Sequence, residues 1–129
     1  MSPRPAALNA RTQVLVADDD LTVLALVRTA LENFGMTCIE AADGPKALEL
    51  ARRRRPDAAV LDVNMPGMDG YEVLAAIRQD QIPTRVLLLT ARQQESDVLR
   101  GFTLGAEDYV VKPFSPLELV ARLKRLLTK

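Results

Sequence analysis

The sequence predicts an α/β fold in which a doubly wound parallel sheet is covered by helices on both faces. Short runs of aliphatic residues recur along the chain, and they are continuous rather than alternating, which is typical of strands buried on both faces. The stretches between these runs carry apolar residues at helical spacing, so strand and helix alternate. The predicted strands span residues 14–17, 36–40, 58–61, 85–89 and 109–111.

Capping residues set the predicted starts of the helices. Asp20 and Asp43 are acidic N-caps of the first two helices, which should run to about residues 34 and 54. For Asp20, capping is a better interpretation than metal binding. Ser115-Pro116-Leu117-Glu118 is a capping box with proline at the first helical position, and it begins the last helix. The remaining helices are expected at about 71–79 and 93–104.

The length and composition indicate one globular domain. The chain has 129 residues, no formal net charge and 48% hydrophobic residues, a profile that disfavours a nucleic-acid coat or a disordered tail. Residues 1–12 should form a flexible leader, because Pro3 and Pro5 occur there with little periodicity. The folded domain is therefore expected at 13–129.

Two features bear on the cell compartment. Cys38 is the single cysteine and lies in an apolar run, so no intrachain disulfide can form, and a reduced intracellular setting with Cys38 in the core is favoured. No apolar stretch approaches the roughly 20 residues that a bilayer span needs, and the leader lacks the apolar centre of a signal peptide. We expect a cytoplasmic protein without a membrane partner.

Polar residues directly follow four of the predicted strands. They are Asp18 and Asp19, then Asp62, Thr90 and Lys112. In an open parallel sheet, ligands bind outside the carboxyl ends of the strands. Each residue alone has an ordinary structural explanation, such as a helix cap, but their joint placement at one edge favours a shared functional pocket.

The acidic residues of this pocket predict a metal site. The carboxylates of Asp18, Asp19 and Asp62 would repel one another strongly at low dielectric, so a cation must neutralise them. Hard oxygen ligands favour Mg²⁺, which keeps several waters and commonly bridges carboxylates to a phosphate. Histidine is absent, which removes the commonest zinc ligand and the commonest general base.

Asp62 is the predicted nucleophile, because an aspartate can attack phosphorus to form an acyl phosphate. Phosphoryl transfer depends mainly on positioning and charge neutralisation, so Lys112 would supply a positive charge and Thr90 a hydroxyl to the phosphoryl oxygens. A cis bond between Lys112 and Pro113 would make a tight turn that aims the ammonium inward. Since the chain has no histidine to carry phosphate, the phosphoryl group must come from another molecule.

Four segments resemble the motifs of a response-regulator receiver domain of two-component signalling. The resemblance covers about residues 13–127 and includes the motifs of the family in order. It implies a five-stranded sheet of order 2-1-3-4-5, the flavodoxin-like (βα)5 fold, for which a chemotaxis member is a standard example. The matching segments are VLVADDD at 14–20, LDVNMPGMDG at 61–70, LTA at 89–91 and YVVKPF at 109–114.

The resemblance also implies the chemistry. Asp62 would accept a phosphoryl group from the phosphohistidine of a sensor histidine kinase or phosphotransfer protein. Mg²⁺ would be held by Asp19, Asp62 and the backbone carbonyl of Asn64, and by Asp18 through water. The domain would assist its own phosphorylation and dephosphorylation and would not be an enzyme.

The resemblance further implies a switch. In receivers, a hydroxyl at the position of Thr90 moves toward the phosphate, and an aromatic side chain at the position of Tyr109 turns inward. The surface of the fourth helix, fifth strand and fifth helix then changes shape. This surface would act on an output domain or partner protein that the sequence does not identify.

The last helix carries more apolar residues than one face can bury. One of its two apolar stripes should therefore remain available to a partner. The first stripe is Leu117, Val120 and Leu127, and the second is Leu119, Leu123 and Leu126.

The same region bears on homodimerisation. Residues 97–126 resemble the receivers of winged-helix transcription factors, which dimerise on this face through paired salt bridges, and Asp108 with Arg122 fits that pattern. Val98 departs from it, because that class usually has a basic residue there to meet the acid at Glu118. A homodimer is thus one expectation that the sequence leaves open. The predicted output face contains Asp108, Glu118, Leu119, Arg122 and Leu123.

Three alternative functions fit the sequence less well. A phosphatase of the haloacid-dehalogenase type also uses an aspartate nucleophile, but it carries an aspartate two residues further on, where this chain has Asn64. A phosphate-independent interaction module would lack Asp62, Lys112 or an acidic partner, and none is missing. Nucleic-acid binding through the arginines at 52–55 is disfavoured, because such residues at a helix end usually interact with the helix dipole. Whether Lys129 is the native terminus stays open.

Overall fold

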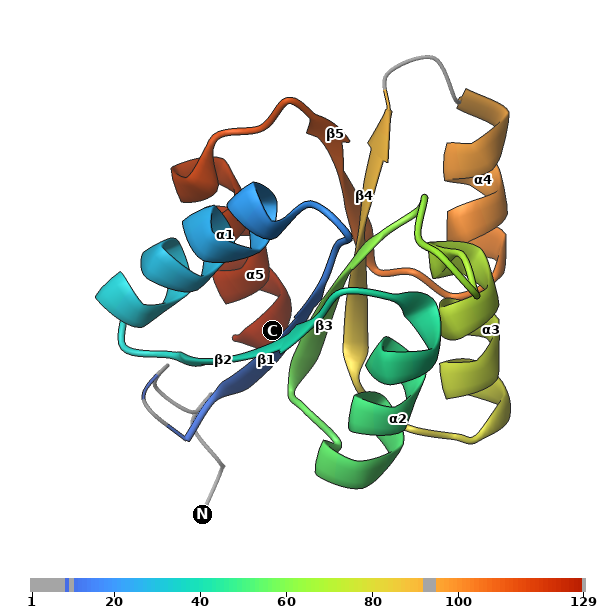
Figure 1. Cartoon of the computed structure of the whole chain (residues 1–129), viewed down its shortest axis with the longest axis horizontal. Coiled ribbons are helices and arrows are strands. Elements are labelled where there is room, and N and C mark those ends of the chain that lie inside the picture. Colours follow the sequence, from blue (N-terminus) through green and yellow to red (C-terminus); the bar gives the residue numbers. More distant parts are fainter. Residues whose placement is uncertain (1–8, 10, 92–94, 129) are drawn as a thin grey trace.

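The computed structural model describes residue 9, residues 11–91 and residues 95–128. The strands are β1 (Gln13–Ala17), β2 (Thr37–Ala41), β3 (Ala58–Asp62), β4 (Arg85–Ala91) and β5 (Asp108–Lys112), and the helices are α1 (Leu21–Asn33), α2 (Gly44–Arg54), α3 (Gly70–Gln79), α4 (Glu95–Thr103) and α5 (Pro116–Leu127). Within the described residues the five strands form one parallel sheet in the order β2-β1-β3-β4-β5. Helices α1 and α5 cover one face of this sheet, and α2, α3 and α4 lie on the other (Figure 1).

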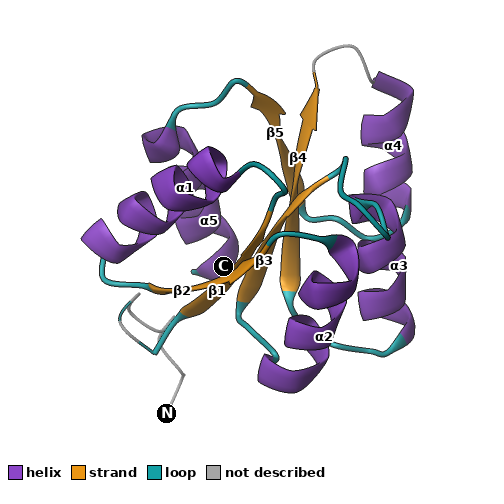
Figure 2. Cartoon of the chain, in the orientation of Figure 1, coloured by secondary structure: helices purple, strands orange, loops and turns teal. Residues whose placement is uncertain are grey.

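This architecture confirms the predicted doubly wound α/β fold and its strand order. Figure 2 shows the strands as a central layer between two layers of helices. Alternate residues of β1 enter different cores, because its side chains point to opposite faces. Val14 and Val16 pack with α1 and α5, whereas Leu15 and Ala17 pack with α2 and α3. Burial on both faces explains why the aliphatic runs are continuous.

The capping residues hold the helix starts as predicted. The side chains of Asp20 and Asp43 accept hydrogen bonds from backbone N–H groups of the first turns at 2.9 and 2.7 Å, and Ser115 does so at 3.4 Å. Asp69 caps α3 in a reciprocal capping box with Glu72, which the sequence analysis did not identify. Side-chain caps therefore fix the first turns of α1, α2, α3 and α5.

Further sequence predictions concern the leader, the start of α4 and Cys38. The predicted leader lies almost wholly outside the described residues, as does Gln93, the predicted start of α4. Cys38 is buried in the core as predicted, and burial raises the pKa of its thiol to about 11, so the thiol stays protonated. Among the described residues, no helix has the length and apolar character needed to cross a membrane.

The prediction that α5 keeps an apolar stripe for a partner is wrong. Helix α5 packs against both the sheet and α1, so residues of both predicted stripes enter the same core. Leu119 and Leu123 are fully buried and cannot belong to an output face, whereas Leu117 is 67% exposed. The buried residues of α5 are Leu119, Val120, Leu123 and Leu126, with Leu127 packed beside them.

The strand register brings the carboxyl ends of four strands together. Ala17 pairs with Leu61, so the residues that follow them, Asp18 and Asp62, start from neighbouring points. Along the other side of β3, Asp62 pairs with Leu89, and Ala91 of β4 pairs with Lys112 of β5. The register thus places the polar residues predicted from the sequence at one edge.

The core on the α2–α3 face should carry much of the stability. Leu61→Ala should lower the free energy of unfolding by about 2–5 kcal/mol, because Leu61 is fully buried and its truncation leaves a cavity. Leu117→Ala is the matched control and should change it by less than about 0.5 kcal/mol. Urea unfolding measures both values, and equal losses in the two variants would contradict this account.

Candidate functional site

Three carboxylates meet at the carboxyl edge of the sheet. Asp18 and Asp19 follow β1, and Asp62 ends β3, so the two neighbouring strands place them together. Carboxylate oxygens of the three residues all lie within 4.8 Å of one another. Asp18 is fully buried and Asp62 is 5% exposed, whereas Asp19 is open to solvent. The predicted acidic cluster is therefore present as a cluster in space.

Lys112 reaches this cluster from the end of β5. Its ammonium donates to Asp18 Oδ2 at 2.8 Å and lies 3.4 Å from Asp62 Oδ1. The bond between Lys112 and Pro113 is cis, as predicted. One positive charge thus faces two buried negative charges, so the cluster keeps a net negative charge.

Backbone N–H groups also face the buried carboxylates. The N–H of Asp20 donates to Asp18 Oδ1 at 2.9 Å, and the N–H of Asn64 donates to Asp62 Oδ1 at 3.4 Å. Asn64 is exposed in the loop that follows β3. These contacts orient both carboxylates, because a carboxylate held by N–H donors loses rotamer freedom.

The environment of Asp62 changes its acidity. Burial raises the pKa of Asp62, the neighbouring charge of Asp18 raises it further, and Lys112 and the N–H of Asn64 only partly oppose them, so the pKa is about 6. Burial lowers the pKa of Lys112, but the hydrogen bond and charge of Asp18 and the charge of Asp62 outweigh it, and this pKa is raised. Near neutral pH the cluster therefore holds a mostly ionised Asp62 beside a charged ammonium.

Thr90 and Tyr109 lie on the neighbouring strands β4 and β5. Thr90 is 3% exposed near the end of β4, next to β3, and its hydroxyl lies 3.4 Å from the carbonyl oxygen of Ala91. Tyr109 is half-buried on β5 and packs edge to face against Phe102 of α4, with 5.4 Å between ring centroids. Tyr109 therefore joins the edge strand to α4.

The polar residues of the predicted output face are paired with one another. Arg122 of α5 donates to both carboxylate oxygens of Asp108 at 3.1 and 3.2 Å, and it lies 3.8 Å from Glu118. Asp108 is 7% exposed, so this pair is partly buried. Exposed apolar side chains near this face include Leu99 and Phe102 of α4, which are 69% and 44% exposed, and Leu117 of α5.

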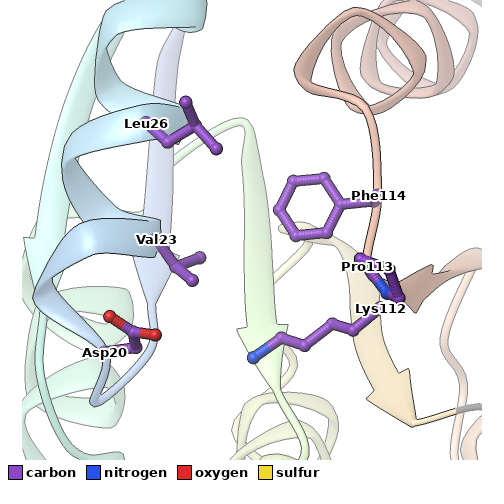
Figure 3. Close-up of a pocket in the computed structure, with 6 residues that line it drawn as sticks. All are labelled: Asp20, Val23, Leu26, Lys112, Pro113 and Phe114. Carbon is purple, nitrogen blue, oxygen red and sulfur yellow. The ribbon is translucent and has the colours of Figure 1, made fainter.

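A pocket beside the acidic cluster was not found from the sequence. It has a volume of about 370 Å³ and opens between α1 and the segment that follows β5. Figure 3 shows Val23 and Leu26 of α1 facing Phe114, with the side chain of Lys112 extending below Phe114 toward α1. The six lining residues are Asp20, Val23, Leu26, Lys112, Pro113 and Phe114. The only sequence signal was that α1 carries apolar residues on more than one face.

Known proteins share the sequence family and the fold of this chain. A family model described as the response regulator receiver domain matches residues 14–124. The chain belongs to the response regulator receiver domain family. Receiver domains are signalling domains of two-component systems rather than classical enzymes, which agrees with the sequence analysis.

Individual relatives of this receiver domain are transcriptional and chemotaxis regulators. The chain is 43% identical over 117 residues to the alkaline phosphatase synthesis transcriptional regulatory protein PhoP of Bacillus subtilis, covering 91% of this chain and 49% of PhoP. It is 46% identical over 117 residues to the transcriptional regulatory protein PrrA of Mycobacterium tuberculosis, covering 91% of this chain and 50% of PrrA. The solved structure of the chemotaxis protein CheY4 of Vibrio cholerae matches with a TM-score of 0.84 and 35% identity, covering 94% of this chain and all of that one. The chain spans about half the length of the two curated relatives.

The raised pKa of Asp62 makes the stability of the receiver domain depend on pH. In the unfolded chain this carboxyl should titrate near its ordinary value of 3.8, so the folded state binds its proton more tightly. Ionisation of Asp62 therefore lowers the free energy of unfolding of the domain, and the full effect is present above about pH 6. This destabilisation fades as the pH falls toward 4.

Asp62→Asn should consequently stabilise the domain at pH 8. The pKa shift corresponds to roughly 3 kcal/mol, and solvent screening at the mouth of the site reduces the expected gain to about 2 kcal/mol. At pH 4.5 the gain should fall to about a third of that value. Urea unfolding in the absence of divalent cations measures both values, and a gain that is the same at both pH values would contradict the assignment to Asp62.

Proposed function

We propose that this receiver domain is a switch that accepts a phosphoryl group on Asp62. The observation that carries the proposal is the placement of Asp62: a nearly buried carboxylate, 3.4 Å from the ammonium of Lys112 and grouped with two further carboxylates. The donor would be the phosphohistidine of a sensor histidine kinase or phosphotransfer protein. An oxygen of Asp62 forms the new bond to phosphorus, and the bond from phosphorus to the imidazole nitrogen of the donor breaks.

The side chains around Asp62 suit this transfer. A pKa of about 6 leaves the carboxylate mostly ionised at neutral pH, which attack on phosphorus requires. Lys112 already lies between Asp18 and Asp62, so its ammonium can contact an oxygen of a phosphoryl group carried on Asp62. Thr90 lies near the end of the adjacent strand, one residue after the partner of Asp62, and we propose that its hydroxyl approaches the same group.

The residues at this site fit Mg²⁺. Asp18, Asp19 and Asp62 offer hard carboxylate oxygens close together, with a net negative charge that Lys112 does not cancel. We propose that Asp19, Asp62 and the backbone carbonyl of Asn64 bind the ion directly and that Asp18 binds it through water. When bound, the ion supplies charge neutralisation for the incoming phosphoryl group.

We further propose that phosphorylation is transmitted through Thr90 and Tyr109 to the face formed by α4, β5 and α5. Tyr109 contacts Phe102 of α4, so a movement of the Tyr109 side chain would change the packing of that helix. The occupant of the face would be an output domain or partner, in keeping with the transcriptional role of relatives twice as long. A homodimer through this face stays a prediction, since Asp108 and Arg122 are paired within the chain.

The arginines at the end of α2 support the structural interpretation of that segment. Arg52 contacts Asp80 at 2.6 Å, and Arg53 contacts Glu49 at 3.2 Å. Both charges are therefore balanced on the surface of this domain. We accordingly propose that the receiver domain does not bind nucleic acid directly. We also propose that it meets its kinase partner in the cytoplasm.

Phosphorylation of Asp62 can be read directly from intact mass. The parent chain, incubated with acetyl phosphate, should gain one phosphoryl group only when Mg²⁺ is present, and Asp62→Asn should gain none. Asp57→Asn is a matched control at the opposite end of β3 and should behave like the parent. An equal gain in Asp62→Asn would refute the acyl phosphate. No gain in the parent would favour a phosphate-independent interaction module, and many turnovers of phosphate release would favour a phosphatase.

The pocket between α1 and Phe114 is the proposed docking surface for the phosphodonor. It adjoins Lys112, and α1 presents Leu26 and Leu21 at 48% and 71% exposure, which favours an apolar contact with a protein partner. A donor seated there would hold its phosphohistidine next to Asp62. The small donor acetyl phosphate would not need this surface.

Leu26→Glu should therefore separate protein donors from small donors. With the sensor kinase that phosphorylates the parent fastest in a purified panel, transfer to Leu26→Glu should be at least about tenfold slower, a loss typical of an interface hot spot. Phosphorylation by acetyl phosphate should be unchanged. Leu99→Glu, at a leucine of α4 that is 69% exposed against 48% for Leu26, is the control and should keep the parent rate. Equal slowing with both donors would contradict a docking role.

A further inference from the structure

The loop that joins β3 to α3 carries Asn64 and is held at both of its ends. The N–H of Val63 donates to the carbonyl of Leu89 at 3.0 Å, which fixes the start of the loop to β4. The N–H of Gly70 donates to the carbonyl of Val63 at 2.9 Å, which closes the loop on itself. The N–H of Asn64 also donates to Asp62 Oδ1 at 3.4 Å, and Asp69 caps α3, so residues 65–68 are the part of the loop whose position depends on other contacts.

The start of α2 meets the middle of this loop. The carbonyl of Pro66 accepts hydrogen bonds from the N–H of Met68 at 3.0 Å and from the N–H of Gly44 at 3.2 Å. Gly44 and Pro66 are distant in sequence, so this contact depends on the tertiary fold. The loop therefore rests on the first turn of α2.

Glycine makes this close approach possible at two points. A Cβ at Gly44 would overlap the backbone oxygen of Met68 and lie 2.6 Å from the Met68 Cβ. A Cβ at Gly67, which has a φ of +80°, would lie 2.9 Å from two ring carbons of Pro45. Any larger residue at Gly44 must move the loop backbone and the first turn of α2 apart, because the obstructing atom belongs to the main chain.

We propose that the first turn of α2, through Gly44 and Pro45, is the seat that sets the position of the Asn64 main chain. Gly44 and Pro45 are then positioning residues for metal binding, although neither touches the acidic cluster. This inference rests on the proposed function, in which the carbonyl of Asn64 is a metal ligand. Sites of this kind need their ligands placed to within about 0.5 Å, and the supporting shell supplies that precision.

The first test is the Mg²⁺ affinity of Gly44→Ala, measured by isothermal titration calorimetry without any phosphodonor. The dissociation constant should rise at least about tenfold, the usual size of the effect when support for a ligand is lost. Leu50→Ala is the control on the same helix: Leu50 is buried in the α2–α3 core, so its truncation weakens the packing of α2 without adding an atom under the loop. It should bind Mg²⁺ within about twofold of the parent, at a temperature where all variants are folded.

A second measurement does not depend on the folding of Gly44→Ala. Gly67→Ala should weaken Mg²⁺ binding, and adding Pro45→Ala should restore at least about threefold of the lost affinity, because the ring that obstructs the new Cβ is gone. The double-mutant cycle separates this contact from the backbone strain at residue 67, which both backgrounds share.

The outcomes distinguish the seat from the proposed function. Weaker binding in Gly44→Ala but not in Leu50→Ala, with recovery in the double variant, would support the seat. Parent-like binding in Gly44→Ala and Gly67→Ala, or an equal loss in Leu50→Ala, would overturn the seat and leave the proposed function standing. If the parent itself bound no Mg²⁺, both would fail.

Discussion

Two buried carboxylates, Asp18 and Asp62, share the carboxyl edge of the sheet with one ammonium group, and the rest of the site depends on this balance of charge. Burial disfavours the ionised form of Asp62, the charge of Asp18 disfavours it further, and Lys112 offsets only part of this cost, so the pKa of Asp62 is raised to about 6. The remaining negative charge favours a divalent cation. Anything that neutralises it when bound to the folded state must also stabilise the fold, so ligand binding and stability are linked at one residue.

The rigid support for this unfavourable arrangement is the sheet itself. The acidic residues lie at the ends of β1 and β3, and helices pack against both faces of these strands. Leu61, directly before Asp62, is fully buried. A carboxylate on a mobile loop could turn to solvent and relieve the repulsion. Because Asp18 and Asp62 are held by the register of β1 and β3, the repulsion is retained in the folded domain until a ligand removes it.

The edge could be predicted from the sequence because its determinants are local: aliphatic runs mark the strands, and the next residue marks the edge. The buried face of α5 could not be predicted from the sequence, because it depends on the packing of α1 against α5. The prediction that Leu119 and Leu123 belong to the output face is wrong for this reason. The pocket beside Phe114 and the contact of Gly44 with Met68 were missed for a related reason. Each is formed by segments that are distant in sequence, so no short stretch of the sequence predicts it.

The pairing of Asp108 with Arg122 limits what salt bridges can contribute to an assembly on this face. Asp108 is 7% exposed, so an unpaired Asp108 would be a costly buried charge. If two copies exchanged these partners, each Asp108 would gain one arginine and lose another, and the number of ion pairs would not change. The net affinity would then have to come from exposed apolar side chains such as Leu99 and Phe102, and the ion pairs would set the register of the contact rather than its strength.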